Sequence, residues 1–196
     1  MPGPRWEETR RRVALTGRVT EAETGHPVAG ACVAISSAPA KVATAHAAAP
    51  HKATTASGPD GHFHFLDLPS GSYAVTASVP GRGGRYGTAS ARARVTVSRD
   101  GTVTAGKLEL AIPATCIVGV VRAPDGMPVP FAEVSLAGGE GDRTQTDSEG
   151  RFALRGVERG DRRLAVSARG FRRETADVRV TRPGAAKTAN VKLTPG

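Results

Sequence analysis

The stretch that decides the fold is DGHFHFLDLPSG at residues 60–71, which returns in altered form as EGRFALRGVERG at residues 149–160. Each copy opens with an acidic residue followed by glycine, a pair typical of a tight hairpin turn. Large apolar side chains then occupy every second position, and this period of two predicts a strand that turns one face to a core. The predicted core side chains of these strands are Phe63, Phe65, Phe152 and Leu154.

The repeat extends upstream of this stretch. Each copy has a glycine inside its first predicted strand, Gly17 or Gly119, where glycine usually marks a bulge or a close approach of another group. A turn glycine and a proline follow in both copies. We expect Pro27 and Pro128 to open the next strand, where a missing N–H does least harm.

Downstream, each copy ends in further segments with apolar residues at alternate positions. Because the two copies account for nearly the whole chain, the sequence predicts a short tail at residues 1–12 and two domains at residues 13–112 and 113–196. The aromatic content is only 4%, and the apolar residues are mostly Val, Ala and Leu. This composition favours an all-β fold, in which β-branched residues pack on pleated faces.

The combined pattern resembles the carboxypeptidase regulatory-like domain, a transthyretin-type β-sandwich. The first copy matches it almost throughout, from Gly-x-Val through Gly-x-Pro-Val and Asp-Gly-x-Phe-x-Phe to Leu-Pro-x-Gly-x-Tyr. The second copy departs at Glu149, Leu154, Glu158 and Arg162, where the family usually has Asp, Phe, Pro and Tyr. The resemblance implies two tandem antiparallel Greek-key β-sandwich domains of about seven strands each. It implies no peptidase activity, because the family's domain serves other modules as a spacer, folding aid, adhesion unit or carbohydrate-binding unit.

The two copies differ in their loops. The first carries about twelve extra residues within residues 39–52, an Ala-rich stretch bounded by prolines. We expect a projecting loop or lengthened hairpin there, which is either functional or simply mobile. Residues 81–87 form a second predicted loop, in which Arg82, Arg85 and Tyr86 could contact an acidic or polysaccharide surface or could merely be solvated.

The motifs do not predict catalysis. A zinc carboxypeptidase needs a His-x-x-Glu pair, and none of the five histidines is followed three residues later by Glu. His62 and His64 lie two apart on a predicted strand, so both could reach one metal ion. The second copy has Arg151 and Ala153 at those positions, which favours a solvent-facing strand surface instead. We therefore predict no catalytic residue, no metal and no cofactor.

The net charge of +9 divides into +2 for the tail, +3 for the first predicted domain and +4 for the second. An excess spread in this way mainly serves solubility, and few aromatic residues lie among the basic ones, so nucleic-acid binding is disfavoured. The densest basic segment lies in the second copy, where strand alternation and nearby acids dilute any single patch. Its candidate contact residues are Arg162, Arg163, Arg169, Arg172 and Arg173.

The N-terminus lacks the apolar run and small-residue cleavage site of a signal peptide. No segment approaches the roughly 18 apolar residues needed to span a bilayer. We therefore expect the chain as given to be cytoplasmic, with an exported or phage-tail-like assembly as an extension of that hypothesis. Cys32 and Cys116 lie at non-equivalent positions of the repeat, so we expect small strand residues and no disulfide.

Two hypotheses for the function follow. The leading one is a non-enzymatic structural or interaction module that presents sheet edges and loops to a protein partner or a larger assembly. The alternative is a carbohydrate-binding or cell-surface-binding module, which the family resemblance and residues 81–87 suggest. Exposed aromatic side chains, on which sugar binding commonly relies, are scarce in this sequence.

Overall fold

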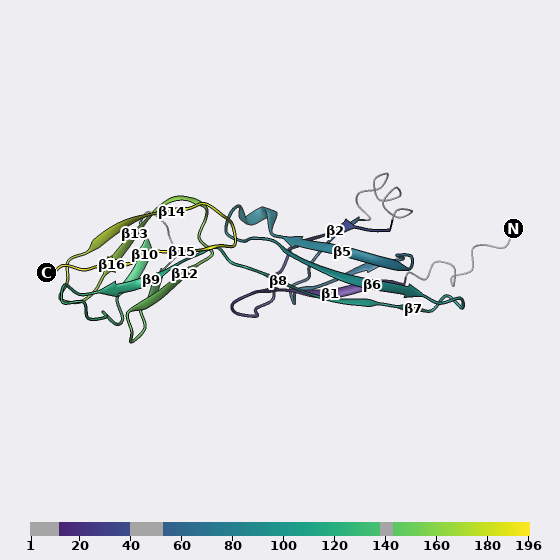
Figure 1. Cartoon of the computed structure of the whole chain (residues 1–196), viewed down its shortest axis with the longest axis horizontal. Coiled ribbons are helices and arrows are strands. Elements are labelled where there is room, and N and C mark those ends of the chain that lie inside the picture. The colour runs from purple at the N-terminus through teal and green to yellow at the C-terminus, as the bar shows by residue number, and fades with distance from the viewer. Residues whose placement is uncertain (1–11, 40–52, 138–142) are drawn as a thin grey trace. The chain divides into compact units, whose positions relative to one another are not determined.

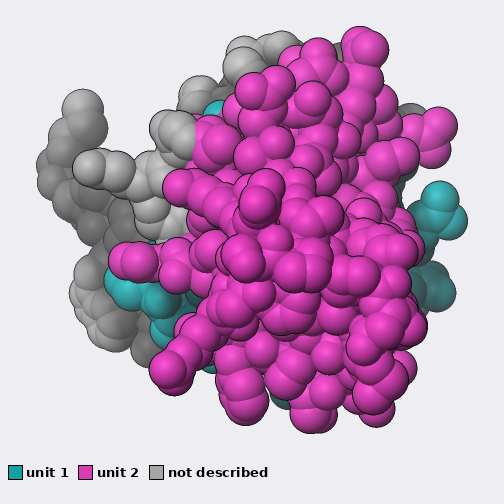
Figure 2. Space-filling model, turned by 90° about the vertical axis from the view of Figure 1, so that its left-hand side faces the viewer, with its two compact units in different colours: residues 1–80, 88–112 teal, residues 81–87, 113–196 magenta. Residues whose placement is uncertain are grey.

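The structure, a computed structural model, describes residues 12–39, 53–137 and 143–196, and the chain forms two compact units (Figure 1). Figure 2 colours these units separately. The predicted loop at residues 39–52 lies outside the described residues, apart from Pro39.

The two units do not divide the chain at a single point. Unit 1 consists of Met1–Pro80 and Thr88–Ile112, and unit 2 consists of Gly81–Gly87 and Pro113–Gly196. Residues 81–87, which belong to the first copy of the sequence repeat, therefore fold with the second copy.

Unit 1 is a sandwich of two sheets with the strand orders β4-β1-β8 and β3-β2-β5-β6-β7. β2 pairs antiparallel with β3, and β5 with β6, within one sheet, whereas the connections before and after β4 cross between the sheets. A 3-10 turn, Pro80–Arg82, follows β5. The strands are β1 (Val13–Glu21), β2 (Cys32–Ser37), β3 (Thr54–Ala56), β4 (His62–Leu66), β5 (Gly71–Ser78), β6 (Ala89–Val97), β7 (Val103–Thr104) and β8 (Gly106–Ile112).

Unit 2 repeats this arrangement, with the strand orders β11-β10-β13-β14 and β12-β9-β15, and β16 also pairs with β9. The predicted all-β fold of two tandem sandwiches is thereby confirmed. The strands are β9 (Cys116–Arg122), β10 (Glu133–Leu136), β11 (Arg143–Gln145), β12 (Arg151–Arg155), β13 (Gly160–Ser167), β14 (Glu174–Val180), β15 (Ala186–Thr188) and β16 (Val191–Lys192).

The first strand of each unit lies between an antiparallel and a parallel neighbour. β1 pairs antiparallel with β4 and parallel with β8, and β9 pairs antiparallel with β12 and parallel with β15 and β16. A parallel pair needs a long crossover connection, and here the rest of the unit supplies it. The structure thus adds one parallel pairing in unit 1 and two in unit 2 to the antiparallel pattern expected from the sequence.

The predicted alternation of buried and exposed residues is observed on β4 and β12. Phe63 and Phe152 are buried as expected, but Phe63 is not the largest buried side chain of its unit. Tyr73 is larger, is only 1% exposed, and donates its hydroxyl to the Pro69 carbonyl at 2.9 Å. Burial raises the pKa of this phenol, because the charged form would lose its hydration.

Pro27 and Pro128 do not open the next strand, contrary to expectation. Each instead makes an isolated antiparallel bridge to the end of the first strand, Pro27 with Thr20 and Pro128 with Arg122. The proline therefore closes the first hairpin of its unit. The chain crosses to the other sheet only after it, and the missing N–H does no harm because the bridge lies outside the regular ladder.

A buried hydroxyl group holds this crossover in both units. In unit 1, Ser57 Oγ donates to the Val28 carbonyl at 2.6 Å and accepts the Ala31 N–H at 2.9 Å. In unit 2, Thr146 Oγ1 makes the equivalent two bonds, at 2.7 and 2.8 Å. Each hydroxyl satisfies one buried donor and one buried acceptor that the turn leaves open.

The first strand of each unit carries a glycine that a phenylalanine covers. Gly17 of β1 pairs with Phe63 of β4, and Gly119 of β9 pairs with Phe152 of β12. A Cβ atom built on Gly17 would lie 2.7 Å from the Phe63 ring, and one on Gly119 would lie 2.9 Å from the Phe152 ring. The same Cβ atoms would also overlap a backbone carbonyl oxygen at the C-terminal end of the unit. The prediction of a close approach at these glycines is confirmed.

We predict that Gly17→Ala and Gly119→Ala each lower the free energy of unfolding by about 3 kcal/mol, the upper end of the cost of overpacking. The cost is high because the added methyl group meets backbone atoms, which cannot rotate away. Urea denaturation followed by circular dichroism measures it. Gly81→Ala is the control, since its Cβ would have no neighbour within 4 Å. A Gly119→Ala variant as stable as the parent would contradict the packing argument.

Candidate binding groove

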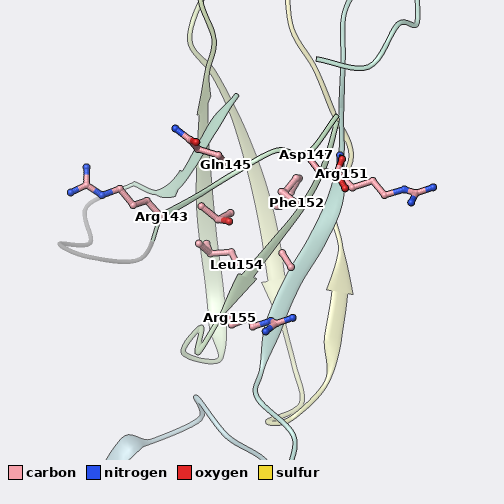
Figure 3. Close-up of a pocket in the computed structure, with 9 residues that line it drawn as sticks. Arg143, Gln145, Asp147, Arg151, Phe152, Leu154 and Arg155 are labelled. Atoms are coloured by element: carbon pink, nitrogen blue, oxygen red, sulfur yellow. The ribbon is translucent and has the colours of Figure 1, made fainter. Parts of the chain in front are cut away.

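A shallow groove of about 590 Å³ lies on unit 2 between β11 and β12 (Figure 3). These two strands are edge strands of different sheets, so the groove follows the open side of the sandwich. Figure 3 shows Arg143 and Arg151 projecting to opposite sides, with Phe152 and Leu154 lying between them. The lining residues are Arg143, Thr144, Gln145, Asp147, Arg151, Phe152, Ala153, Leu154 and Arg155.

The carboxylate of one residue, Asp147, stabilises the turn that joins β11 to β12 through hydrogen bonds. Asp147 Oδ1 accepts the N–H of Glu149 at 2.9 Å and that of Arg151 at 2.8 Å. The Asp147 N–H in turn donates to the Arg151 carbonyl at 2.9 Å. This aspartate is therefore used to shape the turn, as short polar side chains commonly are.

The groove is basic at its rim and apolar at its floor. Arg143, Arg151 and Arg155 are exposed, whereas Phe152 and Leu154 are 5% and 2% exposed. Arg151 makes an ion pair with Glu149 at 2.6 Å. Among the described residues no carboxylate lies within ion-pair distance of Arg143 or Arg155. Within the described residues, the rim therefore carries two charges that no carboxylate neutralises at contact distance.

The strands of unit 1 that match β11 and β12 carry no arginine, although Arg18 of the neighbouring β1 pairs with His62. On β4, His62, His64 and Leu66 occupy the positions that Arg151, Ala153 and Arg155 have on β12. On the facing strand β3, the exposed residues are Thr54 and Ala56. The scaffold is the same in both units, so the basic rim is a property of the side chains of unit 2 and not of the fold.

The histidine pair that the sequence singled out lies on this unit 1 surface. His62 and His64 are both exposed and share one face of β4, as their spacing predicts. No group of three or more potential metal ligands occurs in the described part of the chain, and His46 and His51 lie outside it. The backbone hydrogen bond from His62 lowers the pKa of Asp60, which marks that carboxylate as a turn residue.

The fold does not gather the five candidate arginines of unit 2 into one patch. Arg162 and Arg163 lie in the first half of β13, while the other three follow the end of that strand, near the loop before β14. Arg162 donates to the Glu158 and Arg159 carbonyls, both at 2.8 Å. Arg169, Arg172 and Arg173 are exposed, and nothing described here tests them as contact residues.

Arg163 pairs with an acidic residue of the neighbouring strand β14. It donates from Nε to Asp177 Oδ1 at 2.7 Å, and the two residues pair across β13 and β14. This hydrogen bond, with the added attraction between the charges, lowers the pKa of Asp177. Arg179 lies 3.6 Å from Asp161 on the same face, so this surface is an ion-paired sheet face.

Residues 81–87 are held within unit 2 by a buried threonine. Thr115 is fully buried, and its hydroxyl donates to the Gly84 carbonyl at 2.7 Å and accepts the Gly184 N–H at 2.6 Å. The Gly84 N–H donates to the Glu158 carboxylate. Gly83, Gly84 and Gly87 therefore permit close packing in a segment for which the sequence left a solvated loop or an external contact open.

The three side chains proposed as contacts in this segment lie in different surroundings. Arg82 is exposed, whereas Arg85 and Tyr86 are half-buried. Arg85 donates to the Gly156 carbonyl at 3.0 Å, and Tyr86 forms a short bridge with Ala114. These contacts give Arg85 and Tyr86 a structural role within the unit.

An exposed aromatic that the sequence did not single out lies next to the groove. Phe131 is 75% exposed, has a φ of 54°, and donates its N–H at 3.0 Å to the carbonyl of Thr146, between two groove residues. Unit 1 has Gly30, with a φ of 68°, at the matching position. A bulky side chain in this left-handed region is rare and costs stability. Comparing the two copies at this turn would have found it.

Cys32 is half-buried in β2 and Cys116 is buried in β9, so both are strand residues as predicted. A search of the described residues finds no helix with the length and apolarity needed to cross a membrane.

A family model described as the carboxypeptidase regulatory-like domain matches residues 14–111 and 116–194. A comparison with curated proteins finds no match. Among solved structures, the shaft pilin SpaA from Lactobacillus rhamnosus GG is 11% identical, with 95% of this chain and 98% of that chain covered and a TM-score of 0.44. The Bacillus anthracis TIE protein is 14% identical, with 93% and 34% covered and a TM-score of 0.35. Catechol 1,2-dioxygenase from Acinetobacter sp. ADP1 is 17% identical, with 41% and 52% covered and a TM-score of 0.33.

We predict that Phe131→Gly raises the free energy of unfolding by about 0.5–1 kcal/mol. The left-handed conformation costs an L-residue roughly 1–2 kcal/mol, and glycine avoids this cost. Glycine also loses more chain entropy on folding, which reduces the gain in stability by about 0.5–1 kcal/mol. The exposed ring gives up little packing. Urea denaturation measures the change, and Gly30→Phe in unit 1 should shift stability the opposite way. A less stable Phe131→Gly variant would show that the ring contributes to the fold.

We predict that Arg163→Ala raises the pKa of Asp177 toward the usual aspartate value, as followed by NMR titration of its carboxyl carbon. A lowered pKa in the folded state means that this pair stabilises the fold above the ordinary aspartate pKa. That contribution is lost as the pH falls through the lowered value. Arg162→Ala is the control, because its guanidinium bonds only to carbonyls. An unchanged Asp177 titration in Arg163→Ala would disprove the coupling.

Proposed function

Because this chain belongs to the carboxypeptidase regulatory-like domain family, matched in both units, we propose that it is a non-catalytic interaction protein that binds a protein partner within a larger assembly. Each unit offers a rigid sandwich with several strand edges. A scaffold of this kind supports many functions, so the proposal rests on the side chains that it displays and not on the fold.

The observation that carries the proposal is the groove between β11 and β12 of unit 2. Arg143 and Arg155 lie at its rim without an ion-pair partner among the described residues, and the exposed Phe131 lies beside it. Arginine and aromatic side chains are the types that contribute most to protein interfaces. A strained backbone conformation that exposes an aromatic ring is more readily explained by a contact than by stability.

Carbohydrate binding, the alternative raised by the sequence, receives less support. It relied on residues 81–87, and especially on Tyr86 as an exposed stacking platform. Tyr86 is half-buried and bridged to Ala114, which argues for a structural role. The exposed Phe131 lies next to the edge strands β11 and β12 of the two sheets, and free strand edges are better suited to a polypeptide.

We predict that the full chain, used as bait in an extract of its native host, recovers one partner in stoichiometric amount. Arg143→Ala combined with Arg155→Ala should weaken that capture at least tenfold, because two rim contacts of about 1 kcal/mol each are lost. The control is Arg92→Ala combined with Arg94→Ala, which removes the same charge from the exposed face of β6 in unit 1.

Two results would overturn the proposal. Recovery of no stoichiometric partner would remove its basis. Equal weakening by the groove variant and the β6 variant would show that capture depends on net charge alone.

A further inference from the structure

We infer that the groove of unit 2 binds an extended acidic segment of the partner, which adds as a new strand to the free edge of β12. This inference rests on the proposed function and names the chemistry of the partner. Strand addition to an exposed sheet edge is a general mode of peptide recognition, in which backbone hydrogen bonds give affinity and alternate side chains give specificity.

The hydrogen-bond register of β12 identifies which peptide groups are free. Val121 donates its N–H to the Gly150 carbonyl at 2.8 Å, so these two residues form a hydrogen-bonded pair. Such pairs alternate along an antiparallel ladder with pairs that do not exchange bonds. Phe152 and Leu154 therefore bond to β9, and the peptide groups of the residues between them face the other way.

The outward-facing peptide groups of β12 are those of Arg151, Ala153 and Arg155. Those of Arg151 are already taken, because its N–H and carbonyl both bond to Asp147. For Ala153 and Arg155, no backbone hydrogen bond on this side is made by any described residue. Two donors and two acceptors thus remain at one strand edge, which is the complement that a short added strand requires.

The side chains of β12 set the pattern that an added strand must have. Phe152 and Leu154 face the interior of the sandwich, whereas Arg151 and Arg155 face solvent. Since side chains alternate along a strand, the added segment would place every second residue beside the apolar pair and the others beside the guanidinium groups. The segment should therefore alternate apolar and acidic residues.

The dimensions of the groove suit such a segment. The free edge positions, Ala153 and Arg155, are two residues apart, about 7 Å along a strand, so two acidic positions of the added segment lie along this edge. The groove volume of about 590 Å³ lies within the range of roughly 300–1,000 Å³ that ligand sites occupy. Arg143 on β11 borders the opposite side and adds a third charge.

The same features argue against other occupants. A polysaccharide or nucleic acid has no regular row of peptide donors and acceptors to match Ala153 and Arg155. The matching strand of unit 1, with His62 and His64, carries no fixed positive charge, so an acidic segment should distinguish the two units of one chain. This difference provides an internal control.

The probe is a fluorescein-labelled peptide of sequence EVEVEVE with blocked ends, added to the full chain and followed by fluorescence anisotropy. We expect saturable binding that weakens at least tenfold in the Arg143→Ala, Arg155→Ala variant and is unchanged in the Arg92→Ala, Arg94→Ala variant. A KVKVKVK peptide should not bind. The EVEVEVE peptide with every backbone nitrogen methylated keeps the charge but has no N–H donor, and it should bind at least tenfold more weakly.

Hydrogen exchange locates the added strand independently of affinity. With the peptide bound, the amides of Ala153 and Arg155 should exchange at least tenfold more slowly, while those of His64 and Leu66 in unit 1 should not change. Equal binding of EVEVEVE and its N-methylated form, or no added protection on β12, would reduce the contact to charge attraction and overturn strand addition. A dimer in sedimentation that the groove variant abolishes would make a second copy the occupant instead.

These outcomes separate this inference from the proposed function. If a stoichiometric partner is captured but its cross-links map away from β11 and β12, the acidic-strand inference fails and the interaction role stands. If the peptide binds in the groove but no partner is captured, the site stands and the proposed role within an assembly fails.

Discussion

The contact between the Phe152 ring and Gly119 is the constraint on which unit 2 depends. With no Cβ on Gly119, the ring lies directly over β9 and sets the register of β12 against it. A slip of one residue would turn Arg151 and Arg155 into the core and leave the phenylalanine in solvent, so the register is strongly specified. The basic rim and the free peptide groups of the groove follow from that single register.

Unit 1 is built on the same constraint, with Phe63 over Gly17, yet it displays a different surface. Its equivalent strand presents His62 and His64, and at the crossover it has Gly30 where unit 2 has Phe131. The two copies therefore share what holds the sandwich together and differ in what the sandwich presents to solvent. Duplication of this kind leaves one copy free to acquire a contact surface while its scaffold stays intact.

The boundary between the copies illustrates how repeats and folding units can differ. Residues 81–87 belong to the first copy by sequence, but Thr115 and Glu158 hold them in unit 2. The sequence of a Gly-rich segment does not predict which unit it packs against, because glycine contributes no side chain and only allows other groups to approach closely. The hydroxyls of Ser57 and Thr146 are similar, since their importance arises only when the crossover buries them.

The sequence alone was enough for the family, the all-β class, the two tandem copies, the inward-facing residues of β4 and β12, and the close approach at Gly17 and Gly119. These features depend on the local periodicity of apolar residues and on glycines at defined positions. Both can be recognised from residues that are close in the sequence. Only the tertiary structure decided that β11 and β12 border one groove, that Arg163 pairs with Asp177 across β13 and β14, and that residues 81–87 pack inside unit 2. Those outcomes depend on which strands lie at sheet edges and on which side chains pair across strands. Such contacts join residues far apart in the sequence, so no local periodicity predicts them.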